Sequence, residues 1–286
     1  MAKGRELKAR IRTTENTRKI TRTMEMVSTA KMKRALDRVH AARPYAAALG
    51  DVISGLYSPD LAERFPLLRQ PERERRAAVI LMTADRGLCG GFNSNLIREA
   101  RQLLARLRER GVETELHVEG RRGVGYFRYV GETLMTATTM ISEKPTAADA
   151  QGLVDGVMEK FIKGELDAVY VVYAQFKSAL STPPTTSRVL PVAPPERKGP
   201  VPDYILAPSA DAILSDLLPL YVRNQVYRAL VETAAGEQGA RRTAMKSATD
   251  NAGEMLNLLR RTYNRTRQAA ITQEIAEIVG GAAALE

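Results

Sequence analysis

Hydrophobic residues recur at helical spacing near the amino terminus of the 286-residue chain. Residues 3–43 contain no proline and only one glycine, Gly4. The apolar positions of this stretch form a narrow stripe: Leu7, Ile11, Ile20, Met24, Val27, Ala30, Ala35 and Val39. The pattern predicts a long helix with a thin apolar seam.

The carboxy-terminal stretch has the same character. No proline follows Pro219, and apolar residues advance in steps of three or four: Met245, Ala248, Ala252, Met255, Leu259 and Tyr263. Such steps are typical of a coiled-coil seam. We expect the terminal helices to pair antiparallel across an inserted domain, with one overhanging the other. The apolar end GGAAALE would then need a cover from outside the chain.

Between these helices the pattern changes to alternating strands and helices. Strands are predicted at residues 78–84, 114–118, 133–141 and 168–174. Helices are predicted between them at 96–107, 123–129 and 146–164, the last opening with a Thr146–Asp149 capping box. This alternation predicts a small, mostly parallel sheet covered on both faces. Residues 183–208 hold eight of the 14 prolines and are predicted to be an extended connection.

The net charge of +10 is concentrated at one end of the chain. Residues 1–43 contain 13 Lys or Arg against 4 Asp or Glu, whereas the rest of the chain is nearly balanced. A basic helix is either a solvated face or the contact surface for an acidic partner. A nucleic-acid-binding coiled coil is therefore one alternative.

A glycine-rich segment, DRGLCGGFNSN at residues 85–95, follows a predicted strand and precedes a predicted helix. Nucleotide-binding folds hold phosphate at this place. However, the glycines do not match GxGxxG, and no GK[ST] follows. We expect a structural turn, with a Rossmann-type nucleotide enzyme as the second alternative. The lone Cys89 is expected to be a buried thiol, and the residues predict no catalytic, cofactor or metal site.

Three segments of the chain resemble the gamma subunit family of F-type ATP synthases. They are RIRTTENTRKITRTMEMVSTAKMKRA, DRGLCGGFNSN, and ARRTAMKSATDNAGEML together with TYNRTRQAAITQEIAEIVGGAAAL. The resemblance covers essentially the whole chain. It implies an α/β fold class: a long antiparallel coiled coil of residues 1–55 and 209–286, with an inserted Rossmann-like α/β foot domain at 75–208.

The resemblance also implies a function. The chain would be a non-catalytic central rotor shaft that couples rotation of the c ring, driven by a proton gradient, to conformational cycling of catalytic beta subunits. Its implied partners are the alpha and beta subunits, the epsilon subunit and the c ring, with one copy of this chain and no cofactor. The implied location is the cytoplasmic face of the bacterial plasma membrane, as a peripheral protein.

Eight positions match family positions that contact partners: Met24, Tyr45, Leu206, Arg241, Gln268, Thr272, Glu274 and Leu285. Met24 would face the lever region of beta, or else belong to the helix seam. Arg241 and the three positions at 268–274 would lie near a catch contact with a beta loop, or else on a solvated helix face. Tyr45 and Leu206 match positions near the c ring, and Leu285 matches the tip inside an apolar sleeve. Acidic segments of beta would be the partner of the basic amino-terminal helix.

Overall fold

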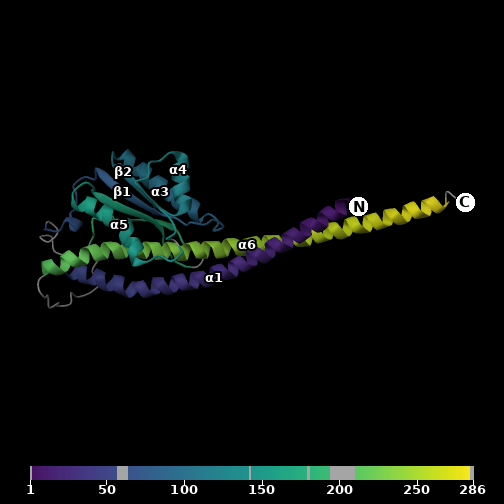
Figure 1. The fold of residues 1–286 in the computed structure, drawn as a ribbon, viewed down its shortest axis with the longest axis horizontal. Coiled ribbons are helices and arrows are strands. Elements are labelled where there is room, and N and C mark those ends of the chain that lie inside the picture. Colours follow the sequence, from purple (N-terminus) through teal and green to yellow (C-terminus); the bar gives the residue numbers. More distant parts are fainter. Residues whose placement is uncertain (1, 57–63, 142, 179–180, 194–209, 284–286) are drawn as a thin grey trace. The chain divides into compact units, whose positions relative to one another are not determined.

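The computed structural model describes residues 2–56, 64–141, 143–178, 181–193 and 210–283. The chain divides into two compact units. The helix-pair unit joins residues 1–28 to 242–286, and the α/β unit comprises residues 29–241. Two long helices contribute to both units: α1 (Ala2–Leu56) and α6 (Ala210–Ala283) (Figure 1). The predicted domains are consecutive segments with boundaries at residues 55, 75 and 208, whereas each long helix is shared between the two units. The predicted boundaries stay a prediction.

A five-stranded sheet forms the centre of the α/β unit, in the order β3-β2-β1-β4-β5. The strands are β1 (Arg76–Met82), β2 (Glu113–Glu119), β3 (Thr136–Thr138), β4 (Ala168–Ala174) and β5 (Pro184–Leu190). The first four pair in parallel, and β5 is antiparallel to β4. Besides α1 and α6, the unit contains η1 (Pro66–Leu68), α3 (Phe92–Glu109), α4 (Arg121–Val130) and α5 (Ala147–Ile162).

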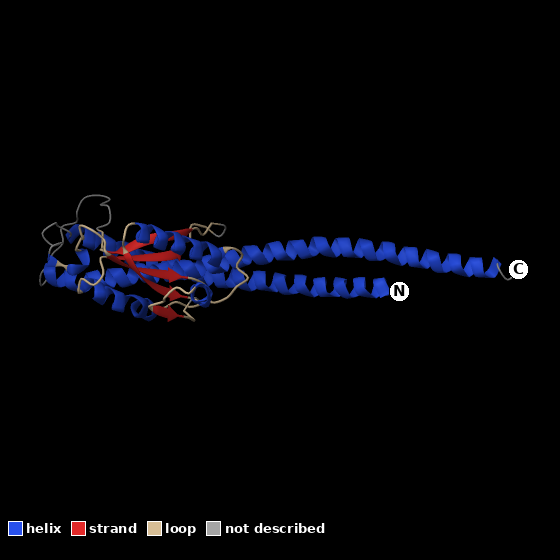
Figure 2. Ribbon diagram, turned by 90° about the horizontal axis from the view of Figure 1, so that it is seen from above, coloured by secondary structure: helices blue, strands red, loops and turns tan. Residues whose placement is uncertain are grey.

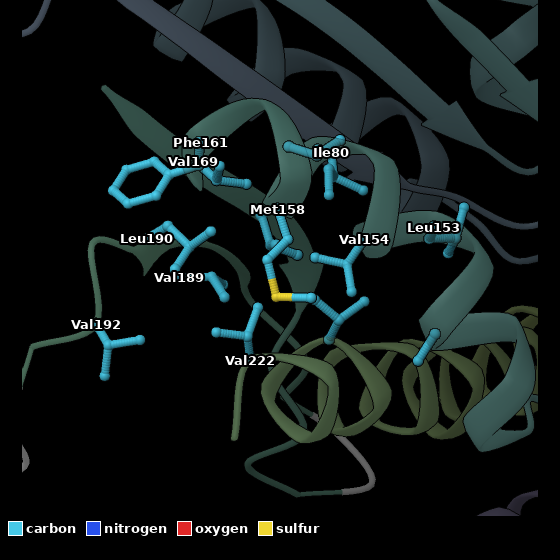
Figure 3. Close-up of a cluster of buried hydrophobic side chains, with 14 of the residues drawn as sticks. Ile80, Leu153, Val154, Met158, Phe161, Val169, Val189, Leu190, Val192 and Val222 are labelled. Atoms are coloured by element: carbon cyan, nitrogen blue, oxygen red, sulfur yellow. The ribbon is translucent and has the colours of Figure 1, made fainter. Parts of the chain in front are cut away.

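Hydrophobic cores lie on both faces of this sheet. Ala78, Ile80 and Met82 of β1 belong to the core that contains α5, α6 and the end of α1. Met158 of α5 and Val222 of α6 both belong to this core (Figure 3). The alternate residues of β1, Ala77, Val79 and Leu81, belong to the second core, which contains α3 and α4. The uninterrupted apolar run of β1 is explained by this burial on both faces.

Most predicted elements of the α/β unit are present, with shifted ends. The strand at 168–174 is observed with the predicted bounds, and the Thr146–Asp149 capping box begins α5. The strand predicted at 133–141 is limited to β3. Residues 184–190, predicted as an extended connection, instead form the edge strand β5. Proline fits there because Pro184 is the first residue of an edge strand, where a missing N–H costs little.

In the helix-pair unit, α1 and α6 run antiparallel (Figure 2). Thr21 Oγ1 lies 2.8 Å from Thr249 Oγ1, and Arg260 forms an ion pair with Glu15. The predicted seam is wrong in places. Ile20, Val27 and Met255 are at least half exposed, whereas the small hydroxyl residues Thr21 and Ser28 are buried. Among the side chains of this unit that the structure describes, Met245 and Leu256 are the other buried ones.

The physical reason is that a hydroxyl can be buried once it is hydrogen-bonded. Thr21 Oγ1 donates to the Arg18 carbonyl at 3.1 Å, within its own helix. Thr21 and Ser28 are seven residues apart, the repeat of a coiled-coil seam, and their small side chains permit close approach. Ile20, Met26 and Val27 of α1 are therefore left on the outside of the pair.

Candidate functional site

The glycine-rich segment begins where β1 ends, and it is fixed by side chains of this region. Thr83 Oγ1 donates to the Glu119 carbonyl at 2.9 Å and accepts from the Gly123 amide at 3.0 Å. The Asp85 carboxylate accepts from the backbone amides of Arg121 at 3.0 Å and Met140 at 2.9 Å. Because Arg121 is the first residue of α4, this carboxylate also faces the positive end of a helix.

Two glycines of this region have conformations that other residues rarely adopt. Gly90 has φ +59°, and Gly120, at the end of β2, has φ +96°. A Cβ on Gly120 would lie 2.2 Å from the Thr83 carbonyl oxygen, so a side chain there is excluded without moving the backbone. Leu88 also has a positive φ, 62°. The turn is therefore a tightly specified backbone structure.

One face of α6 contacts the carboxyl end of the sheet. Arg241 donates to the Gly87 carbonyl from Nε at 3.3 Å and from Nη2 at 3.2 Å. Nη2 also donates to Glu237 Oε1 at 2.5 Å. Thr233 Oγ1 accepts from the Ala174 amide at 3.2 Å, and Glu232 Oε2 accepts from the Phe176 amide at 3.2 Å. The chain's own helix thus lies where dinucleotide-binding folds place their ligand.

Burial shifts the pKa of several groups near this edge. Glu119 is 1% exposed, and burial, with Asp85, Glu237 and Asp149 nearby, raises its pKa to about 9. Burial also raises the pKa of Glu237, while Arg241 opposes this change. The pKa of the Cys89 thiol is raised by burial, which keeps the thiol protonated and unreactive.

The described residues also bear on three other kinds of feature: an imidazole site, a metal site and a membrane-spanning helix. His117 Nδ1 lies 2.9 Å from Thr136 Oγ1, and burial lowers the pKa of the imidazole. No cluster of three or more His, Cys, Asp or Glu within the described ranges is suited to holding a metal ion. Among the same residues, no helix combines the length and the apolar character that crossing a membrane requires.

The positions suggested as partner contacts fall in both units. In the α/β unit, Tyr45 of α1 is 53% exposed, whereas Arg241 is only 7% exposed. In the helix-pair unit, Met24 is half-buried, and the three positions of α6 are exposed: Gln268, Thr272 and Glu274. Thr272 Oγ1 donates to the Gln268 carbonyl at 3.0 Å. Leu206 and Leu285 lie outside the described residues.

Two surfaces were missed by reasoning from the sequence. The first is an exposed apolar stripe near the end of α6: Ile271, Ile275, Ile278 and Val279. The spacing of three and four residues between these positions is a signal of an apolar helix face in the sequence. The second is the polar face of α6 that contains Glu232 and Glu237, both buried. Gly236, in the middle of a helix, was the available signal for close packing.

An α/β unit whose sheet is bound by the chain's own long helix, and a helix pair with exposed apolar residues, are typical of a structural subunit of a larger assembly. A family model described as "ATP synthase" matches residues 3–285. The ATP synthase gamma chain of Gemmatimonas aurantiaca is 65% identical over 289 residues, with both chains covered completely. That of Leptospira biflexa is 44% identical over 288 residues, also with full coverage. The chain belongs to the ATP synthase gamma chain family.

Solved structures show the same fold. A chain of the Euglena gracilis mitochondrial ATP synthase, solved with OSCP, F1 and c-ring, has a TM-score of 0.68 at 19% identity, with 99% of this chain and 95% of that chain covered. A chain from the central stalk and c-ring of the Tetrahymena thermophila enzyme has a TM-score of 0.62 at 24% identity, with 80% and 99% covered. The predicted fold class and the resemblance to the gamma subunit family are confirmed.

Proposed function

We propose that this chain is the central rotor shaft of a proton-translocating F-type ATP synthase. It would couple rotation of the c ring to conformational cycling of the catalytic beta subunits. The observation that carries the proposal is the 65% identity, over the full length, to a curated gamma chain. The exposed apolar residues of the helix-pair unit fit this role, because a shaft enclosed by other subunits needs a surface that those subunits can bury.

The proposed partners are a ring of alpha and beta subunits, the epsilon subunit and the c ring, with one copy of this chain. The related solved structures contain a central stalk, F1 and a c-ring, which supports the ring of alpha and beta subunits and the c ring as partners. ATP chemistry would take place on beta, so the chain itself would not be an enzyme. Its place would be the cytoplasmic face of the plasma membrane, where the c ring would hold it.

Rotation can drive chemistry only if the shaft interacts differently with the beta conformations. A shaft with equal free energies of interaction toward open and closed beta would shift no equilibrium when it turns. The shaft must therefore present different side chains on different faces. The helix-pair unit does so, since exposed arginines and exposed apolar residues both occur along α1.

The individual contacts stay proposals. Met24 and the exposed positions 268–274 would face beta, Tyr45 and Leu206 would lie near the c ring, and Leu285 would lie at the tip in an apolar sleeve. The basic face of α1 would meet acidic segments of beta. Four of its exposed arginines are Arg10, Arg12, Arg18 and Arg22.

The test is to replace these four arginines with glutamine and to assemble the chain with alpha, beta and the membrane sector. Exposed charges contribute little to folding, so the helix content and the melting transition should stay as in the parent. ATP-driven proton pumping should fall relative to ATP hydrolysis. A matched control replaces four exposed arginines of the α/β unit: Arg98, Arg101, Arg106 and Arg128.

The control should pump protons as the parent does. If the two quadruple variants pump equally well, the basic face is not part of the shaft contact. If the parent chain never assembles with alpha and beta, or binds nucleic acid instead, the rotor function itself is wrong.

A further inference from the structure

The glycine-rich turn has no role in the contacts proposed above, yet its backbone is tightly specified and touches α6. We propose that Arg241 is a positioning residue that clamps α6 onto this turn, and that the clamp keeps the helix and the α/β unit turning together under load. The proposal rests on the rotor function. It identifies a contact inside the chain that would bear force during rotation.

The centre of the clamp is a buried charge with a backbone partner. The Arg241 side chain binds the Gly87 carbonyl through two nitrogens, and it binds Glu237, which is only 2% exposed. Hydrogen bonds to a charged group are stronger than those between neutral groups, and more so where water is excluded. The short, buried contact between Arg241 and Glu237 also holds the guanidinium in its orientation.

The turn that presents the Gly87 carbonyl is itself held in place. Asn93, in the first turn of α3, accepts from the Ala84 amide at 2.9 Å through its Oδ1. Its Nδ2 donates to Cys89 Sγ at 3.2 Å. The positive φ angles of Leu88 and Gly90 then direct the chain back toward α3. Arg241 therefore grips a backbone group that is fixed to both β1 and α3.

A second row of contacts lies along the same helix face. Thr233 accepts from the amide of Ala174, the last residue of β4, and Glu232 accepts from the amide of Phe176, just after that strand. Between the rows lies Gly236, where an added Cβ would be only 3.3 Å from the Ala174 Cβ. The helix therefore approaches the sheet closely, and its polar side chains reach backbone groups directly.

Directional contacts matter in a rotor because apolar burial resists displacement only weakly. Burial energy depends on area, so an apolar helix face can slide or roll with a small loss. Hydrogen bonds depend on distance and angle, so a small roll of α6 would break them. A buried ion pair is otherwise an expensive way to stabilise a fold, which favours a role in fixing geometry.

The substitution Arg241→Met removes the donors and keeps a long side chain. In the isolated full-length chain, the amides of Ala174 and Phe176 report on the clamp, because their acceptors belong to α6. Hydrogen exchange at both amides should accelerate by roughly tenfold to a hundredfold. The control is Lys246→Met, at an exposed position of the same helix, and it should leave both rates unchanged.

The second readout is coupling in the assembled enzyme. At equal rates of ATP hydrolysis, Arg241→Met should stop pumping at a smaller opposing proton gradient than the parent, and Arg241→Lys should lie between the two. If Arg241→Met does not fold, Glu237→Gln keeps the side-chain shape and should show both effects more weakly. Unchanged amide exchange, or pumping equal to the parent against the same gradient, would overturn the clamp. Failure of the parent assembly to pump at all would instead count against the rotor function.

Discussion

Glu119 should make the stability of the α/β unit depend on pH in the neutral range. The residue ends β2, is 1% exposed, and its Oε1 has no hydrogen-bond partner among the described residues. Burial is the main cause that raises its pKa from an ordinary value of 4.5 to about 9. The folded protein therefore holds a neutral acid here at physiological pH.

The sign of the effect follows from proton binding. Between pH 4.5 and about 9 the folded state keeps a proton that the unfolded state has released. Unfolding thus releases one proton, and the free energy of unfolding falls as pH rises, by about 1.4 kcal/mol per unit. Between about pH 6 and about pH 8 this one group should lower stability by about 3 kcal/mol.

The variant Glu119→Gln retains the shape and a hydrogen-bond donor but cannot ionise. In this variant the free energy of unfolding should no longer fall with pH by the amount that one proton contributes. The free energies of unfolding of the parent and the variant should therefore differ most at the alkaline end. The assay is urea unfolding of the full chain, followed by far-ultraviolet circular dichroism at several pH values. Glu113→Gln, at an exposed position of the same strand, is the control. Parallel pH profiles for the parent and Glu119→Gln would show that Glu119 does not hold an extra proton in the folded state.

Three further predictions concern other contacts. Gly120→Ala should destabilise the α/β unit by more than about 3 kcal/mol, measured by urea unfolding, because its Cβ would meet the Thr83 carbonyl; a loss below 1 kcal/mol would contradict this. Asp155→Asn should cost only about 1 kcal/mol in the same assay, since its bidentate pair with Arg223 is partly exposed. Deleting Gly280–Glu286 should leave the melting transition unchanged and lower ATP synthesis in proton-pumping vesicles. A collapsed transition would show that the tip belongs to the fold.

The α/β unit could be predicted well because its signals are local. A continuous apolar run identifies β4, and Thr146 with Asp149 identifies the start of α5. The edge strand β5 was missed because prolines around it suggest a connection. Proline is allowed at the first position of an edge strand, and that depends on the neighbouring strand rather than on the local sequence.

The seam of the helix pair was predicted less well. Hydrophobicity favours Ile20 and Val27, yet Thr21 and Ser28 are buried. Thr21 and Ser28 are buried because the partner helix approaches closely and because a carbonyl of the same helix can accept a hydrogen bond from a hydroxyl. Local hydrophobicity reports neither of these. The exposed apolar residues fit a helix pair that other chains cover.

The site residues show a similar limit. Family resemblance identified Arg241 as a position near a partner contact, but only the structure places its guanidinium on the Gly87 carbonyl. The two residues are 154 positions apart in sequence, and the acceptor is a backbone oxygen that any residue carries. No sequence pattern marks such an acceptor. The glycine spacing predicts a structural turn rather than a phosphate loop, and this stays a prediction.

The central claim is that this chain turns inside a ring of catalytic subunits. The most direct measurement uses a variant in which the buried Cys89 is replaced by Ala and the exposed Lys163 by Cys, so that a probe can be attached to the α/β unit. The labelled chain is assembled with alpha and beta, the ring is fixed to a surface, and ATP is added. The probe should rotate in one direction while ATP is hydrolysed. Sustained hydrolysis by an intact assembly with a stationary probe would contradict it.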